Sequence, residues 1–163
     1  MEETNSLNSS ENITSLIWKL SIGSALAWEI SKFFGSSHPY LGPVSLILTV
    51  QSTMDKTISL SIKRVIGTMI GIGITVIIAS YLKVTGWNLG LLILIGTYIA
   101  KYLKLDKKVI HQVALTILFV FAFEHQSKVY AMDRMRDTLV GVLTAGLIQV
   151  VWSTLSSRKN ELK

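Results

Sequence analysis

The amino-acid sequence predicts an all-α polytopic membrane protein with six transmembrane helices in a 3+3 inverted repeat. Half of its 163 residues are hydrophobic and only 16% are charged, whereas about a quarter of an average soluble domain is charged. The charged residues lie between long apolar runs, as they must if those runs cross hydrocarbon, where an unpaired charge is costly. The third observation is an internal repeat, in which Arg64 and Thr68 return seventy positions later as Arg134 and Thr138.

The amino-acid composition also excludes several kinds of functional site. The chain has no cysteine, which excludes disulfides, thiol nucleophiles and thiolate metal sites. Its three histidines do not have metal-ligand spacing, so we expect neither a metal site nor a cofactor. The net charge of +6 is also found in proteins that bind nucleic acid. However, the basic residues flank apolar segments instead of lining one face, so the predicted partner is the lipid bilayer and not nucleic acid.

The first half of the chain begins with a polar segment. Residues 1–15 carry acidic side chains and no Lys or Arg, and we predict a polar cytoplasmic tail there. The first span is expected from about Leu16 to Phe34, and a turn over residues 35–39 ends it. A second apolar run, Tyr40–Val50, is short and contains Pro43. The alternative to six spans is a count of five, in which this second run is re-entrant.

The third span is predicted over Val65–Leu82, whose 18 residues are enough to cross a bilayer core at about 1.5 Å per residue. The fourth runs from Gly86 to about Leu103, and the fifth, Val109–Phe123, is short like the second. The sixth span is Thr138–Leu155, so the membrane domain covers residues 16–155. Residues 156–163 are predicted to form a basic cytoplasmic tail.

The repeat is supported by a second motif in the same frame. A shift of seventy positions carries Ile47–Val50 onto Ile117–Val120, and the short second run onto the short fifth. Because three spans per half is an odd number, the two halves must point in opposite directions across the membrane. Such inverted repeats are common among secondary transporters. The alternative is chance coincidence among frequent apolar residues.

Orientation follows from the basic residues. If both termini share one side, that side holds eleven Lys and Arg residues and the other side holds five. The positive-inside bias then places both termini in the cytoplasm. The five on the outer side are Lys32, Lys83, Lys128, Arg134 and Arg136, whereas Lys63 and Arg64 lie on the cytoplasmic side.

Five motifs together resemble a known family. They are Ala25-Leu-Ala-Trp28, Pro39-Tyr-Leu-Gly-Pro43, Leu48-Thr-Val-Gln51, Arg64-Val-Ile-Gly-Thr-Met-Ile-Gly71 and Arg136-Asp-Thr-Leu-Val-Gly141. Their order and spacing are similar to the membrane half of the fusaric acid resistance and aromatic acid exporter family, which is related to plant aluminium-activated malate transporters. The resemblance covers about Leu16–Leu155. It implies a six-helix module of the bacterial cytoplasmic membrane that moves organic anions and assembles as a homodimer or higher homo-oligomer.

The arginines are the first candidates for the substrate site. A carboxylate that passes through hydrocarbon needs fixed positive charge, and arginine keeps its charge at any working pH. Arg64 and Arg136, at opposite membrane faces, would provide entry and exit contacts through bidentate hydrogen bonds. Arg134 competes with Arg136 for this role, and Thr68 belongs to the same repeated motif as Arg64. The alternative is that these arginines are boundary anchors that reach lipid phosphates.

Two further residues are candidates. Pro43 removes a backbone donor beside Gly42, which leaves polar backbone groups able to face a ligand. The matching fifth segment has no proline and carries Gln112 near its start instead. Glu29 is the carboxylate within an apolar run, and burial favours its neutral form, so it is the candidate for proton coupling. The alternative is an interfacial ion pair with Lys32 on the same helix face.

These observations predict a membrane transporter that exports aromatic carboxylic acids or related organic anions. The alternative is a non-transporting membrane assembly or regulatory module that needs a partner chain. An enzyme is disfavoured, because no acid–base pair or nucleophile set gathers on one side of the membrane. The driving force, a proton gradient or the membrane potential, is left open by the sequence.

Overall fold

The computed structural model describes the backbone of residues 2–79, 81–123 and 129–161, and the side chains of residues 13–78, 81–123 and 129–155. Within that part of the chain it has six α-helices and no strand, so the prediction of an all-α protein is confirmed. The helices are α1 (Glu2–Phe33), α2 (Leu41–Ile47), α3 (Met54–Ala79), α4 (Gly86–Tyr102), α5 (Lys107–Phe123) and α6 (Tyr130–Glu161). Residues 124–128 and 162–163, parts of the predicted outer loop and C-terminal tail, lie outside the described residues.

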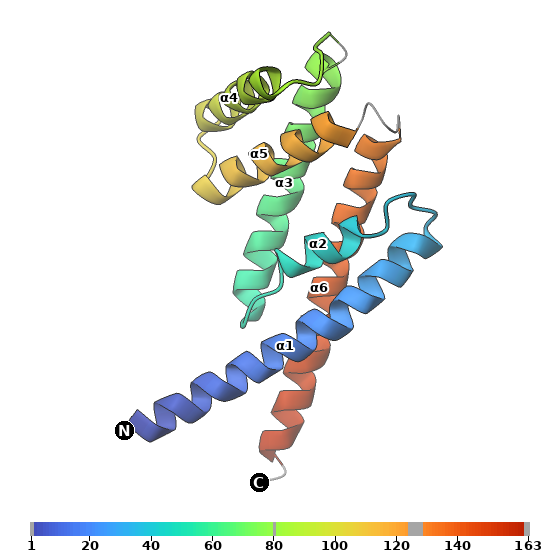
Figure 1. The fold of residues 1–163 in the computed structure, drawn as a ribbon. Helices are drawn as coiled ribbons and strands as arrows, with labels where there is room; N and C mark the ends of the chain where they lie inside the picture. Colours follow the sequence, from blue (N-terminus) through green and yellow to red (C-terminus); the bar gives the residue numbers. More distant parts are fainter. Residues whose placement is uncertain (1, 80, 124–128, 162–163) are drawn as a thin grey trace.

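Two long helices form the centre of the molecule. α3 and α6 pack against each other and run in opposite directions, with the other four helices around them (Figure 1). In the described part of the chain, these two helices are long and apolar enough to cross a membrane, over Met54–Ile78 and Tyr130–Leu155. Both begin well before the apolar runs predicted at Val65 and Thr138. Arg64 and Arg134 therefore lie inside helices and not at their ends.

The other helices differ in length from the predicted spans. α2 has seven residues, or about 10 Å, which is too short to cross a bilayer as a helix. α4 and α5 have 17 residues each, at the lower end of the length that crosses. α1 begins at Glu2, so the backbone of the predicted N-terminal tail is helical. Six helices form in the described part of the chain, as predicted, but only α3 and α6 are candidate membrane spans there, so the six crossings stay a prediction. A continuous second span does not form.

Pro43 does not break α2, contrary to the expectation that it would loosen this segment. It is the third residue of the helix, where a backbone N–H has no intrahelical partner, so its missing donor costs no hydrogen bond. The helix ends instead at Ile47, with Leu48 as its C-cap, and the backbone N–H groups of Thr49 and Val50 both turn back to the Leu46 carbonyl, at 2.9 and 2.8 Å. The segment after α2 is nevertheless buried at Thr49 and Val50.

Helix packing follows the internal repeat. α2 packs on α1 and α6, and α5 packs on α4 and α3, so exchanging the first three helices for the last three leaves these principal contacts unchanged. A Cβ added at Gly71 would lie 2.6 Å from the Thr116 Cβ, and one added at Gly141 would lie 2.9 Å from the Leu46 backbone nitrogen. The two pairs are equivalent in the repeat, because Gly141 lies seventy positions after Gly71 and Leu46 lies seventy positions before Thr116. These two glycines allow the close approach of α3 to α5 and of α6 to α2, the contacts that join the two halves.

The interior is unusually polar for a helical bundle. Small apolar clusters fill each side, with Val113 and Ile117 among the core of α3, α4 and α5, and Ala27 and Ala145 among that of α1, α2 and α6. Between them lie buried arginines, carboxylates, hydroxyls and an amide: Ser45, Thr49, Arg64, Thr68, Gln112, Thr116, Asp133, Arg134, Asp137 and Thr138. Many large apolar side chains are exposed on the outside, as expected where lipid is the solvent.

Candidate functional site

Arg64 is the centre of a contact between three helices. Its side chain is 3% exposed, although it lies near the start of the longest apolar stretch of α3. The Nη1 group donates a 2.8 Å hydrogen bond to Gln112 Oε1 on α5, and Nη2 donates a 3.3 Å bond to Ser45 Oγ on α2. Nε has no partner among the described residues. The guanidinium is thus held by neutral groups, and no carboxylate neutralises it in the described part of the chain.

Gln112 is oriented by its other contacts. Its Nε2 group lies 3.4 Å from the hydroxyls of both Thr68 and Thr116, so the amide NH₂ faces two acceptors and the amide oxygen faces Arg64. Gly67, one turn after Arg64, makes room for this side chain, since a Cβ there would lie 2.6 Å from the Gln112 Cβ. The structure therefore brings Arg64 and Thr68, two of the candidate substrate-binding residues, together through Gln112, which contacts both.

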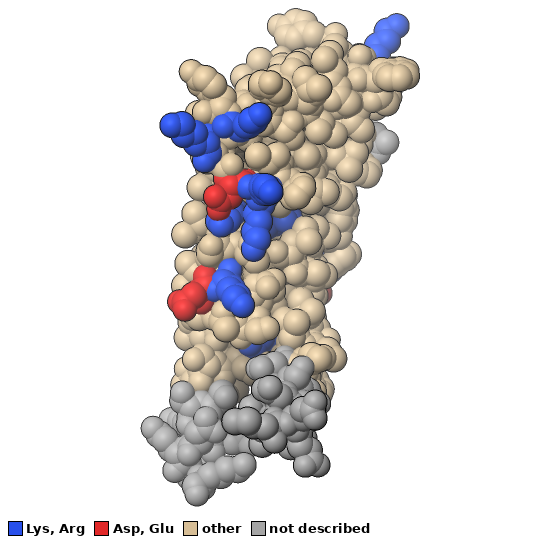
Figure 2. Space-filling view, turned by 90° about the vertical axis from the view of Figure 1, so that its left-hand side faces the viewer, with Lys and Arg blue, Asp and Glu red and all other residues tan. Residues whose placement is uncertain are grey.

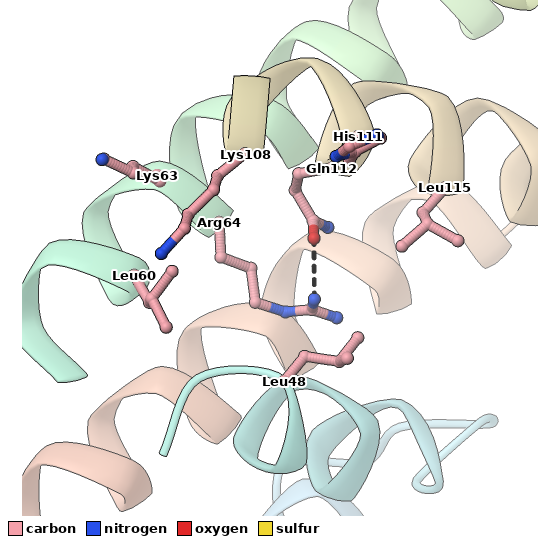
Figure 3. Close-up of a pocket in the computed structure, with 8 residues that line it drawn as sticks. All are labelled: Leu48, Leu60, Lys63, Arg64, Lys108, His111, Gln112 and Leu115. Atoms are coloured by element: carbon pink, nitrogen blue, oxygen red, sulfur yellow. Dashed lines mark hydrogen bonds between the residues drawn. The ribbon is translucent and has the colours of Figure 1, made fainter. Parts of the chain in front are cut away.

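A pocket of about 180 Å³ opens beside Arg64 (Figure 3). Its walls combine cationic groups with leucine side chains. The lining residues are Leu48, Leu60, Lys63, Arg64, Lys108, His111, Gln112 and Leu115. None of them is acidic. Such a lining suits a small molecule with one anionic end and one apolar end.

One cation of this pocket is already paired. Lys63 Nζ forms an ion pair with Asp106 in the connection between α4 and α5. This hydrogen bond lowers the pKa of the exposed Asp106 carboxyl, which therefore keeps its negative charge at neutral pH and compensates Lys63. Arg64 and Lys108 remain as the cations of the pocket without a described carboxylate partner.

The face around the pocket is basic. Seen from the side that carries the α4–α5 connection, the surface shows several groups of Lys and Arg and few acidic residues (Figure 2). The connection and its flanking helix ends supply Lys101, Lys104, Lys107 and Lys108. A cluster of positive charge at one end of apolar helices is typical of the cytoplasmic boundary of a membrane protein.

Arg134 has a different environment. It is 0% exposed, and its guanidinium carbon lies 4.8 Å from the centre of the Phe119 ring on α5, a cation–π contact. None of its guanidinium nitrogens has a hydrogen-bond partner among the described residues. Its charge is close enough to act electrostatically on Arg64. The two arginines of the repeat thus share one interior.

The guanidinium of Arg136 is part of a hydrogen-bonded polar network near the start of α6. Its Nη2 group donates a 2.6 Å hydrogen bond to Asp133 Oδ1. The second oxygen of Asp133 lies 2.9 Å from His38 Nδ1 and accepts a 3.1 Å bond from the Ser37 backbone N–H. These contacts fasten the α1–α2 connection to α6. Arg136 is the predicted exit contact, and that role stays a prediction. Among the described residues its guanidinium is paired with Asp133, whereas the guanidinium of Arg134 has no hydrogen-bond partner.

The remaining predicted residues lie apart from the arginines. Glu29 is on an exposed face of α1 and, among the described residues, forms no ion pair with Lys32. Its role in proton coupling stays a prediction. Pro43 is half-buried, two positions before Ser45, whose hydroxyl does reach Arg64. Neither Ser45 nor Asp137 was predicted from the sequence, although Asp137 is one turn from Arg134, a spacing that places both on one helix face.

Two apolar helices of membrane length, with arginines and hydroxyls buried among the helices, are the arrangement expected of a membrane transporter, because charges inside such helices mark solute pathways. The family described as aromatic acid exporter family member 1 matches residues 11–152. The chain belongs to this family of transporters, as its motifs had indicated. Comparison with curated proteins and with solved structures gave no match.

Proposed function

We propose that the protein exports aromatic carboxylic acids or related organic anions across the bacterial cytoplasmic membrane. The observation that carries the proposal is the pocket at Arg64, where a buried guanidinium without a described carboxylate partner meets leucine walls. A carboxylate would complete the hydrogen bonding of the guanidinium, and an aromatic ring would contact the leucines. Arg134, buried deeper in the bundle without a described hydrogen-bond partner for its guanidinium, is the proposed second contact.

The proposal includes six membrane crossings in two inverted triplets, with both termini in the cytoplasm. The N-terminus and the α2–α3 and α4–α5 connections lie toward the left of Figure 1, and the α1–α2 and α3–α4 connections toward the right. The basic face shown in Figure 2 lies on the same side as the N-terminus and the α2–α3 and α4–α5 connections. This position supports the assignment of that side to the cytoplasm. α2 with the buried segment after it is the proposed second crossing, since non-helical backbone is tolerated at membrane depth where protein encloses it.

The test is flux of labelled benzoate from liposomes that contain the purified chain. We expect benzoate to leave wild-type liposomes when a membrane potential, negative inside, is imposed. Arg64→Ala is expected to abolish this flux, while Lys56→Ala, an exposed cation of α3 outside the pocket, is expected to keep it. Flux that survives in Arg64→Ala would remove the pocket from the mechanism. If wild-type liposomes release benzoate only when a partner chain is added, the protein is an assembly or regulatory module instead.

We also propose a homodimer or higher homo-oligomer, as the family resemblance implies. Large apolar side chains are exposed along α3 and α6, including Ile77 and Leu143, at 70% and 66%. These faces are available to lipid or to a second copy. Native mass spectrometry of the detergent-solubilised chain measures the number of copies, and a strictly monomeric species that transports benzoate would contradict this part of the proposal.

A further inference from the structure

Asp137 is a buried carboxylate that the proposed function does not use. It is 0% exposed and lies on α6, three positions after Arg134. Its Oδ2 atom accepts a 2.5 Å hydrogen bond from Ser36 Oγ, while Oδ1 has no partner among the described residues. Arg134 is equally buried, and its guanidinium has no hydrogen bond in the same part of the chain. Two opposite charges therefore lie within one helical turn, each incompletely satisfied, without forming an ion pair.

A buried charge needs a partner, because leaving it unpaired in a low-dielectric interior is costly. Arg134 can be neutralised by the Asp137 carboxylate or by a bound anion. Asp137 can be neutralised by Arg134 or by a proton. The carboxylate and a substrate anion thus compete for the same guanidinium.

We propose that Asp137 is the internal competitor of the substrate anion, and that its protonation removes the negative charge that compensates Arg134, so that Arg134 binds an aromatic anion. The inference rests on the proposed function and adds a proton-dependent step to it. In that step, one proton passes from water to a carboxylate oxygen of Asp137, and the anion forms hydrogen bonds with Arg134. Proton and anion each favour binding of the other, by linkage. Anion binding therefore strengthens as pH falls.

The internal repeat restricts this step to one half of the protein. A shift of seventy positions carries Gly67 onto Asp137 and Arg64 onto Arg134. The first arginine is therefore accompanied by a glycine and by the neutral Gln112, and the second by a carboxylate. The Arg64 pocket has no acidic lining residue, so this competition is specific to Arg134.

The other ionisable groups around Asp137 come from three elements. α6 contributes Tyr130, Asp133 and Arg136, the α1–α2 connection contributes His38 and Tyr40, and α3 contributes Arg64 through its effect on Arg134. α5 contributes the non-ionisable Phe119. Asp133 is already satisfied by Arg136 and His38. His38 contacts Asp133 in the neighbouring network, so it provides the matched control.

The experiment measures binding of benzenesulfonate, an aromatic anion that stays ionised at acidic pH, to the purified full chain by calorimetry. We expect wild-type affinity to rise by about fivefold or more between mildly alkaline and mildly acidic pH. Asp137→Asn is expected to bind at all pH values as tightly as the wild type does in acid. His38→Gln is expected to keep the wild-type pH dependence. A pH dependence that persists in Asp137→Asn, or disappears in His38→Gln, would overturn the proposal.

A second measurement does not depend on the folding of a variant. Wild-type binding heats in two buffers with different ionisation enthalpies report the protons exchanged, and we expect net proton uptake on binding in the pH range where the affinity changes. Binding without proton uptake would overturn the role of Asp137 while leaving benzoate export intact. A wild-type protein that neither binds benzenesulfonate nor transports benzoate would overturn both proposals together.

Discussion

The guanidinium of Arg64 on α3 and the amide oxygen of Gln112 on α5 are joined by a 2.8 Å hydrogen bond inside the bundle. The neutral Gln112 side chain thus accepts one hydrogen bond from the buried Arg64 guanidinium, but it does not compensate the positive charge of that group. An anion that enters the adjoining pocket can supply what is missing.

Replacing Gln112 tests this arrangement. Gln112→Leu removes the acceptor from a buried guanidinium, and we expect it to destabilise the protein by about 1–3 kcal/mol. Gln112→Glu places a carboxylate against Arg64 and is expected to weaken benzoate binding by competing for the guanidinium. Thermal unfolding in detergent and benzoate calorimetry measure the two effects. Benzoate affinity equal to wild type in Gln112→Glu would show that the anion does not use Arg64.

Gly141→Ala tests the close contact between α6 and α2. The added methyl group would meet the Gly42 carbonyl oxygen and the Leu46 backbone nitrogen, neither of which can rotate away. We expect a loss of stability of about 1–3 kcal/mol. Gly73→Ala is the matched control, since a Cβ there meets nothing within 4 Å, and its effect should stay within about 0.5 kcal/mol. Equal unfolding temperatures for the two variants would contradict the packing.

Asp106→Asn tests the charge of the pocket. With its pKa lowered by Lys63, Asp106 is ionised at neutral pH and compensates that lysine until the pH falls through its lowered pKa. Removing the carboxylate leaves Lys63 free to attract anions, so we expect a modest gain in benzoate affinity that weakens as salt is added. The measurement is a benzoate titration at low and high ionic strength. An affinity that falls in Asp106→Asn would show that Lys63 needs this partner for its position.

Single cysteines test the topology on a background that has none. Thr53→Cys and Lys104→Cys, in the α2–α3 and α4–α5 connections, are expected to react with an impermeant thiol reagent only from the cytoplasmic side. Ser37→Cys and Val84→Cys are expected to react only from the outside. Labelling Thr53→Cys and Val84→Cys from the same side would mean that α3 does not cross the membrane, and the inverted arrangement would fail.

Much of the fold followed from the sequence, because apolar runs and their flanking charges are local signals. The runs indicated an all-helical chain, and the motifs identified its family. The starts of α3 and α6 were missed, since Met54–Lys63 and Tyr130–Asp137 are polar and the apolar pattern that marked the spans begins only after them. The short α2 was partly expected. Pro43 was expected to leave polar backbone groups free beside Gly42, whereas it lies in the first turn, where its missing N–H costs no hydrogen bond.

The site was harder to predict than the fold. Arg64 and Thr68 came from a repeated motif that the sequence displays directly. Their partner Gln112 lies 48 positions beyond Arg64, and the pairing is set by how α3 packs on α5, which no local pattern encodes. Arg134 and Arg136 could not be separated from sequence, because the difference depends on which of them faces Asp133.

The shift of seventy positions that relates the helix packing of the two triplets has a consequence for movement. In this conformation Arg64 borders an open pocket while Arg134 is sealed against Phe119. If the triplets exchanged their conformations, Arg134 would gain the opening and Arg64 would become enclosed. In the proposed topology that opening would face the other side of the membrane. The sequence repeat would then give the site access to each side of the membrane in turn.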